Sequence, residues 1–242
     1  MRPNVDVQPL SGATHWQREV DTDNSIYFMA RSGGLFGSVY VEVQRFTPDN
    51  LDFANPEIVA TFNIKKMSMV HSFSVTKNYA VFFYYSMATT GGMCMIRNRF
   101  HVMECIQEME NEPTDIYVVN LKTGEVHEIS AMTFFAFHHI NAYEINNGTE
   151  ILLDMSPSDP RGLEEYPAFE NMLNPPEHST GTNGSTCGDE EITRYHINLV
   201  SKTVEASTFP NLHTGENKRY VNKFDFGTIN EAYRGKEVCS KH

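Results

Sequence analysis

The chain has 242 residues, 40% of them hydrophobic and 12% aromatic, so it contains enough apolar material for a folded core. Its 19 Lys and Arg residues against 31 Asp and Glu residues give a net charge of −12 at pH 7. A nucleic-acid-binding surface needs clustered basic residues, but the longest basic run is the pair Lys65 and Lys66. Composition therefore excludes a disordered chain and argues against a nucleic acid partner.

No segment has the character of a transmembrane span or a secretory leader. The longest apolar run covers only residues 79–85, whereas a spanning helix needs about 20 residues. The first residues contain no apolar stretch typical of a signal peptide. We therefore expect a cytoplasmic protein in which Cys94, Cys105, Cys187 and Cys239, which form no CxxC pair, are free thiols.

In chain order, short runs of β-branched and aromatic residues recur between turn-forming residues, a pattern that predicts strands. We expect these strands at residues 26–31, 38–46, 57–64, 79–85, 115–121, 125–129, 149–155, 192–200 and 203–207. The turn sequences KTG at 122–124 and NNG at 146–148 predict antiparallel hairpins. Short helices are expected only at residues 103–109 and 164–173. The fold class is predicted to be all-β.

An internal repeat favours one all-β architecture. Residues 117–126 match residues 195–204 in the pattern Y-x-[VI]-N-L-x-[ST]-x-[ET]-V. A hairpin that recurs between variable loops is typical of a β-propeller with four-stranded blades, and a β-sandwich is the alternative. We expect a single domain over residues 1–242. Prolines and a Ser-, Thr- and Gly-rich stretch predict a long loop excursion at residues 156–189.

Histidine offers the clearest chemistry in the sequence. The hydrolase and nucleotide-binding motifs GxSxG, HExxH and GxGxxG are missing. His71 and His138 lie in the apolar β segments MVHSFSV and FFAFHHINAYE, where an imidazole needs a polar partner. A hydrogen bond to the backbone would satisfy each of them, and so would a buried metal ion. Neutral imidazoles from separate strands suit Fe, Zn or Cu and leave positions for a small ligand.

The same segments carry a family resemblance. MVHSFSVTKNYAVFF around His71, and FHHINAYE around His138 followed by TEILLD, are similar to two blocks of the carotenoid cleavage oxygenases, a family that includes the retinoid isomerohydrolase of the eye. The sequence around His15 resembles the first histidine block of this family, with Trp16 in place of a proline. Residues 220–236, YVNKFDFGTINEAYRGK, resemble a further block, so the resemblance covers most of the chain.

This resemblance implies a seven-bladed β-propeller that holds a non-haem Fe(II) ion with four histidines from four blades. His15, His71 and His138 match the first three ligands, whereas His139 is not expected to be one. Asp225 stands where the family has a glutamate that supports the third histidine, and a solvated strand residue is the competing interpretation. Family members are longer and the fourth histidine block has no match here, so we expect a central fragment with a partial propeller.

The implied function is an Fe(II)- and O2-dependent dioxygenase that cleaves a double bond of a carotenoid or apocarotenoid to carbonyl products. Phe135 and Phe137 are expected to line the substrate tunnel. Met87, Met109 and the methionines between them are expected either to form an apolar patch for peripheral membrane contact or to fill an irregular core.

Three alternatives to this function remain open. The first is a retinoid isomerohydrolase of the same family, which acts on a retinoid ester. The second is an inactive propeller fragment that binds a lipid or a protein partner without iron. The third is a propeller hydrolase that uses no redox metal. These alternatives differ in their products and in their dependence on iron.

Overall fold

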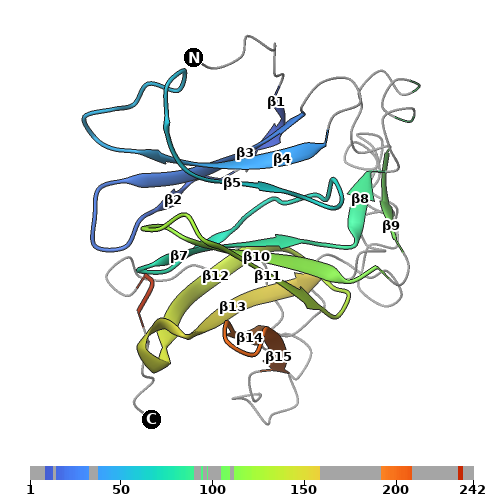
Figure 1. Ribbon diagram of the computed structural model, residues 1–242. Helices are drawn as coiled ribbons and strands as arrows, with labels where there is room; N and C mark the ends of the chain where they lie inside the picture. Colours follow the sequence, from blue (N-terminus) through green and yellow to red (C-terminus); the bar gives the residue numbers. More distant parts are fainter. Residues whose placement is uncertain are drawn as a thin grey trace, which may run out of the picture.

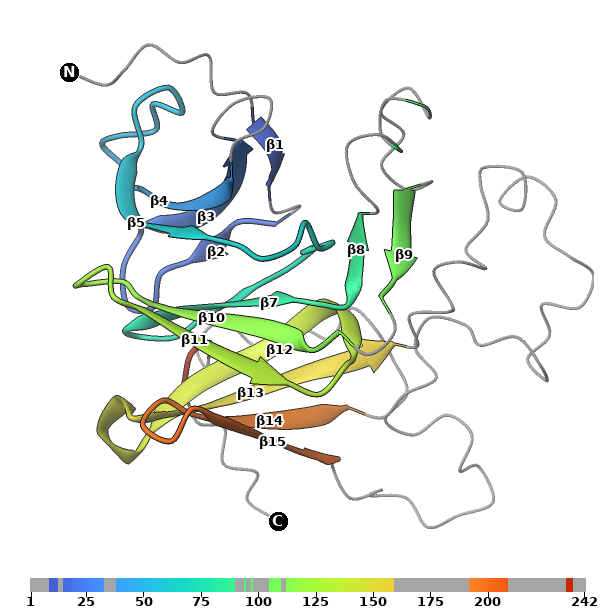
Figure 2. The same cartoon turned by 45° about the vertical axis from the view of Figure 1, so that its right-hand side comes forward.

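The structure is a computed structural model that describes residues 9–12, 15–32, 38–89, 94, 97, 105–109, 112–158, 192–208 and 234–236. Most of these residues lie in β-strands (Figures 1 and 2). Within the described residues, the strands form three larger antiparallel sheets and a two-stranded sheet. The predicted all-β class is confirmed.

Each larger sheet is built from one stretch of the chain, and the stretch that forms the second sheet also contains the strands of the small sheet. The first sheet contains β1 (Pro9–Gly12), β2 (Gln17–Arg18), β3 (Ser25–Ser32), β4 (Val39–Phe46) and β5 (Glu57–Asn63). The second contains β6 (Ser74–Val75), β7 (Tyr79–Tyr84), β10 (Thr114–Asn120) and β11 (Val126–Ala131). The third contains β12 (Phe135–Ile145), the 3-10 turn η2 (Asn146–Gly148), β13 (Glu150–Ser158), β14 (Thr193–Asn198) and β15 (Thr203–Thr208). The small sheet pairs β8 (Met87–Thr89) with β9 (Ile106–Glu108).

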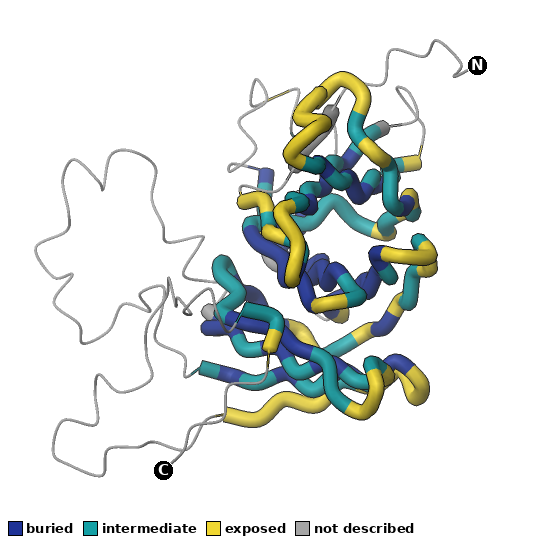
Figure 3. Tube along the Cα trace, turned by 90° about the vertical axis from the view of Figure 1, so that its left-hand side faces the viewer, coloured by how far each residue is buried: buried dark blue, intermediate teal, exposed yellow. Residues whose placement is uncertain are grey.

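The three larger sheets are arranged like successive propeller blades. Their strand orders are β1-β3-β4-β5, with β2 also paired to β3, then β6-β7-β10-β11 and β12-β13-β14-β15, reading from one edge to the other. The sheets lie face to face (Figures 1 and 2), and the edge strand β6 of the second sheet contacts both β2 and β12. These strands form a shared inner edge, whereas β15 at the opposite edge of the third sheet is mostly exposed (Figure 3).

Each copy of the internal repeat lies in a separate sheet, the first copy in the second sheet and the second copy in the third. The two copies form the hairpins β10–β11 and β14–β15, which occupy equivalent positions in successive sheets. In the first hairpin, the side-chain oxygen of Asn120 accepts hydrogen bonds from the N–H groups of the two residues that begin the turn, at 2.9 and 3.1 Å. Asn198 makes the same two bonds at 3.0 and 2.9 Å. The shared asparagine therefore builds the same turn twice.

Every strand predicted from the sequence is present, but two other predictions need correction. The helix predicted at residues 103–109 is wrong at residues 106–108, because these residues form β9 and satisfy the backbone groups of β8. The loop excursion predicted from residue 156 starts too early, because residues 156–158 continue β13. Residues 159–189, including the second predicted helix at 164–173, lie outside the described residues.

β7 is buried on both faces, which explains why its sequence is a continuous apolar run. Side chains alternate between the two faces of a strand. Phe82 therefore packs in the cluster between the first and second sheets, with Phe28 and Phe73 at centroid distances of 5.1 and 5.0 Å. Phe83 packs in the cluster between the second and third sheets, with Phe134 at 5.7 Å. One strand thus joins two cores.

Two charged side chains link neighbouring sheets. Arg45 on β4 donates from Nη2 to the carbonyl oxygen of Leu121, in the turn of the second sheet, at 2.7 Å. Glu144 on β12 accepts hydrogen bonds from Thr76 Oγ1 at 2.7 Å and from the Asn78 backbone N–H and side-chain amide at 2.6 Å each. These bonds are directional, so they fix how each sheet sits on the next.

Cys94 and Cys105 form a disulfide, so the prediction of free thiols is wrong for this pair. The pairing of β8 with β9 brings together two cysteines that the sequence separates by 11 residues. Cys187 and Cys239 lie outside the described residues. Disulfides are rare in cytosolic proteins, so the free-thiol argument for a cytoplasmic location no longer holds.

For Met87 the structure supports the second of the two alternatives, because this side chain is 1% exposed and lies in a hydrophobic core. Met109 is 38% exposed, and the methionines between them lie outside the described residues. The described part of the chain contains no helix with the length and apolarity of a transmembrane span.

We expect Glu144→Ala to lower the free energy of unfolding by about 1–3 kcal/mol, because the buried hydroxyl of Thr76 and two partly buried donors of Asn78 lose their acceptor. Urea denaturation measures this change. The control is Glu128→Ala on β11, whose side chain is 45% exposed and pairs with Lys65, and which should cost less than about 1 kcal/mol. Equal losses for the two variants would contradict a special role for Glu144.

Candidate metal centre

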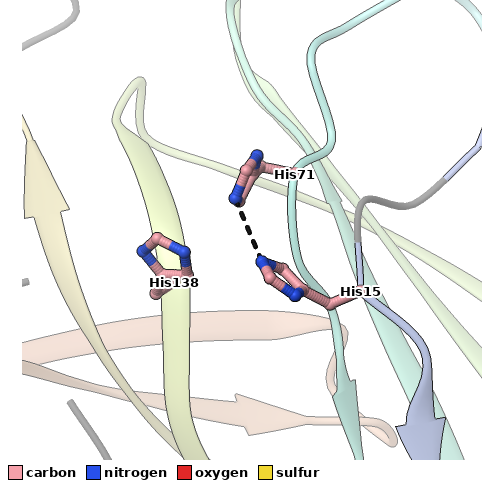
Figure 4. Close-up of side chains that lie close together, drawn as sticks. All are labelled: His15, His71 and His138. Carbon is pink, nitrogen blue, oxygen red and sulfur yellow. Dashed lines mark hydrogen bonds between the residues drawn. The ribbon is translucent and has the colours of Figure 1, made fainter. Parts of the chain in front are cut away.

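Three histidines converge where the inner edges of the three sheets meet. His15 precedes β2, His71 precedes β6 and His138 lies in β12. Figure 4 shows their imidazole rings grouped together. One ligand nitrogen from each ring lies within 4.8 Å of the other two, and the ring centroids are 4.8 to 5.6 Å apart. The structure thus brings together the three histidines singled out in the sequence.

Irregular backbone positions these side chains. β1 and β2 pair with successive parts of β3, so they form one interrupted inner strand, and His15 lies at the interruption. The pairing of β12 with β13 shifts register between Ala136 and His139 and again between His139 and Asn141. Such irregularities redirect side chains that a regular strand would point at a sheet face. They allow His138 to project toward the other two histidines (Figure 4).

Within the cluster, Nε2 of His15 lies 3.2 Å from Nε2 of His71. When both rings are neutral, one nitrogen donates this hydrogen bond and the other accepts it. Two nitrogens that each lie about 2.1 Å from one metal ion are roughly 3–4 Å apart. The spacing of this pair is therefore compatible with two neighbouring metal ligands as well as with a hydrogen bond. A set of imidazoles suits Fe(II) as well as Zn or Cu.

His139 has a different environment from His138. Its Nδ1 lies 2.8 Å from Ser74 Oγ, and its Nε2 lies 3.2 Å from the Tyr85 hydroxyl. Burial, and to a lesser extent His138, lowers the pKa of His139 to about 3, so the ring is neutral. One ring nitrogen then donates and the other accepts. Protein groups engage both ring nitrogens of His139. The assignment of His138 as the metal ligand of this pair stays a prediction.

The two phenylalanines predicted for the tunnel have different surroundings. Phe137 meets His71 edge-on at a centroid distance of 5.5 Å, so it borders the histidine cluster. Phe135 is fully buried and packs against Tyr85 at 5.1 Å and Phe137 at 4.8 Å. Their role in a tunnel stays a prediction.

Asp225, predicted to support His138, lies outside the described residues, so its role also stays a prediction. In the structure, Ser74 of β6 and Tyr85 bond to His139, and Asn141 lies in β12, the strand that carries His138. Sequence reasoning did not assign these residues a role. For Ser74 and Asn141 the signal was available, because each is a polar residue in an apolar segment and needs a buried partner.

Comparisons with known proteins identify the family. The model of the family described as "Retinal pigment epithelial membrane protein" matches residues 5–238. The chain is 31% identical over 169 residues to the "Carotenoid-cleaving dioxygenase, mitochondrial" of Mustela putorius furo, an alignment that covers 65% of this chain and 30% of that protein. It is 32% identical over 87 residues to the "Apocarotenoid-15,15'-oxygenase" of Synechocystis sp., covering 36% of this chain and 17% of that protein.

Solved structures share the fold. A cobalt-substituted Synechocystis ACO and an ACO/RPE65 chimera each superpose with a TM-score of 0.63 at 19% identity, covering 94% of this chain and 43% of the other. The chain therefore spans less than half the length of these relatives. Fold and site together define a protein of blade-like β-sheets with a histidine cluster at their inner edge. With the family match, the chain belongs to the carotenoid cleavage oxygenase family.

The adjacent histidines provide a matched pair of variants. We expect His138→Leu to weaken Co(II) binding by more than about 100-fold. Removing a ligand should lower metal affinity more than removing a hydrogen bond that supports a ligand, which costs about 10- to 100-fold. His139→Leu should retain Co(II) binding within about tenfold. It should lower the free energy of unfolding by about 1–3 kcal/mol, because Ser74 and Tyr85 lose their partner.

Isothermal titration with Co(II) and urea denaturation measure the two effects. Similar losses of Co(II) affinity in both variants would contradict the assignment of His138 as the ligand of the pair.

Proposed function

We propose that this chain takes part in cleaving a double bond of a carotenoid or apocarotenoid to carbonyl products, with Fe(II) held by His15, His71 and His138. The observation that carries this proposal is the convergence of three imidazoles from three successive sheets. The substrate class is supported by the family match and by two relatives named as a carotenoid-cleaving dioxygenase and an apocarotenoid oxygenase.

In this proposal the three sheets are consecutive blades of a seven-bladed propeller, as the family resemblance implies. The described sheets do not close into a ring. The resemblance adds a fourth histidine ligand, for which this sequence has no matching block. In this proposal His15, His71 and His138, which lie close together, supply three of the four ligands.

Fe(II) supplies, when bound, the redox chemistry that O2-dependent cleavage requires. The residues of the chain bind and orient it. Three neutral imidazoles add no negative charge, so the ion keeps its full positive charge, and they leave positions for a small ligand. Because Ser74 and Tyr85 hold His139, they also restrain the backbone from which His138 projects.

Phe137 and Phe135 are proposed to line the path of the substrate. Phe137 lies against His71, so an apolar conjugated chain next to it would lie close to the metal ligands. Aromatic side chains suit such a ligand because they offer a large apolar surface of defined shape. Asp225 is proposed to support His138. Of the predicted methionine patch, exposed Met109 remains a candidate for membrane contact.

Turnover of an apocarotenoid in detergent micelles under 18O2 tests this function. We expect the Fe(II)-loaded chain to form carbonyl products that carry the label, detected by mass spectrometry, and His71→Ala to form none. The control is His127→Ala. This histidine lies on β11 of the second sheet, outside the histidine cluster, and its replacement should leave product formation intact.

Product formation that survives His71→Ala or an iron chelator would contradict the proposal, as would an iron-loaded chain that forms no product. Release of a free retinoid from an ester without O2 would instead indicate an isomerohydrolase.

A further inference from the structure

A short segment from the C-terminal part of the sequence, residues 234–236, is bonded to the strand that carries His138. The backbone N–H of Gly235 donates to Asn141 Oδ1 at 3.0 Å. The side-chain amide of Asn141 donates to the carbonyl oxygen of Lys236 at 3.2 Å. Asn141 lies in β12, three residues after His138, and is 8% exposed. Its amide therefore uses both its donor and its acceptor on the backbone of this segment.

The same segment is bonded to the region that follows His15. Arg234 Nη1 donates to Gln17 Oε1 at 2.8 Å, and Gln17 begins β2, two residues after His15. Lys236 Nζ lies 3.4 Å from Asp21 Oδ1, and both side chains are more than half exposed. The segment thus contacts the first sheet as well as the third.

Close packing reinforces this contact. Gly235 has a φ of +69°, a conformation that glycine adopts without strain. A Cβ atom at this position would lie 2.4 Å from Val20 Cγ2. A side chain at this position would therefore clash with Val20, so the observed packing of the segment against the first sheet requires glycine.

We propose that residues 234–236 form a cross-brace that fixes the separation between His15 and His138, with Asn141 as its positioning residue. These two histidines come from the first and third sheets, which the second sheet separates along the chain. The brace bonds to both inner strands within three residues of each ligand. Its consequence for metal binding rests on the proposed function.

An asparagine is suited to this position because one amide supplies both a donor and an acceptor. A carboxylate would place an oxygen against the carbonyl oxygen of Lys236, and an apolar side chain would leave two backbone groups without partners. The brace therefore needs both the hydrogen-bond donor and the acceptor of the Asn141 side chain, and a side chain of equal volume without them would not replace it.

Asn141→Ala tests the brace against Asn198→Ala. Asn198 also accepts hydrogen bonds from two backbone N–H groups, but in the outer hairpin of the same sheet. We expect Asn141→Ala to weaken Co(II) binding by about 10- to 100-fold and to change the visible absorption of bound Co(II), which reports its coordination geometry. Asn198→Ala should lower stability but leave Co(II) affinity and the spectrum unchanged. A folded Asn141→Ala protein with unchanged affinity and spectrum would overturn the proposal.

A second pair of variants covers the case in which Asn141→Ala does not fold. Gln17 is only partly buried, so its replacement should be tolerated. Gln17→Glu keeps an acceptor for Arg234 and should retain the Co(II) affinity of the unmodified chain, whereas Gln17→Leu should weaken it. Equal affinities for these two variants would overturn the contribution of this arm of the brace.

Hydrogen exchange separates failure of the brace from failure of the metal proposal. If the unmodified chain binds no Co(II), the proposed metal site fails, but the brace still predicts faster amide exchange at residues 17–32 and 135–145 in Asn141→Ala. In Asn198→Ala, faster exchange should be confined to β14 and β15. Unchanged exchange around β2 and β12 in Asn141→Ala would overturn the brace itself.

Discussion

β7 is buried on both faces, and this burial holds the three larger sheets together. Alternate residues of this strand pack into two hydrophobic clusters, one shared with the first sheet and one with the third. The second sheet is therefore held from both sides, and the three sheets lie face to face (Figure 1). This packing brings their inner edges together, and the histidine cluster lies where those edges meet.

Apolar packing is not directional, so it does not by itself set the distance between two imidazoles. Directional hydrogen bonds between the sheets restrict this distance. Arg45 links the first sheet to the second, and Glu144 links the second to the third. Asn141, through residues 234–236, connects the third sheet back to the first. All three links cross between sheets, so local unfolding of one sheet should disturb its neighbours.

Sequence reasoning succeeded where structure is determined locally. Strand patterns, the two hairpins and the repeat with its shared asparagine all depend on neighbouring residues, and the structure contains each of them. The helix at 103–109 and the free state of Cys94 failed because β8 and β9 pair across a loop. The joint role of the histidines came from family resemblance, since no local pattern shows that three inner edges meet. The partners of His139 and Asn141 likewise depend on tertiary packing.

Iron analysis combined with X-ray absorption at the iron edge, after anaerobic loading and desalting, tests whether the three inner-edge histidines hold one Fe(II) ion. We predict about one iron per chain, with scattering from imidazole ligands. This iron should be lost in His15→Ala, whose side chain is exposed and outside both cores. A folded chain that retains no iron, or equal iron with and without His15, would contradict this prediction.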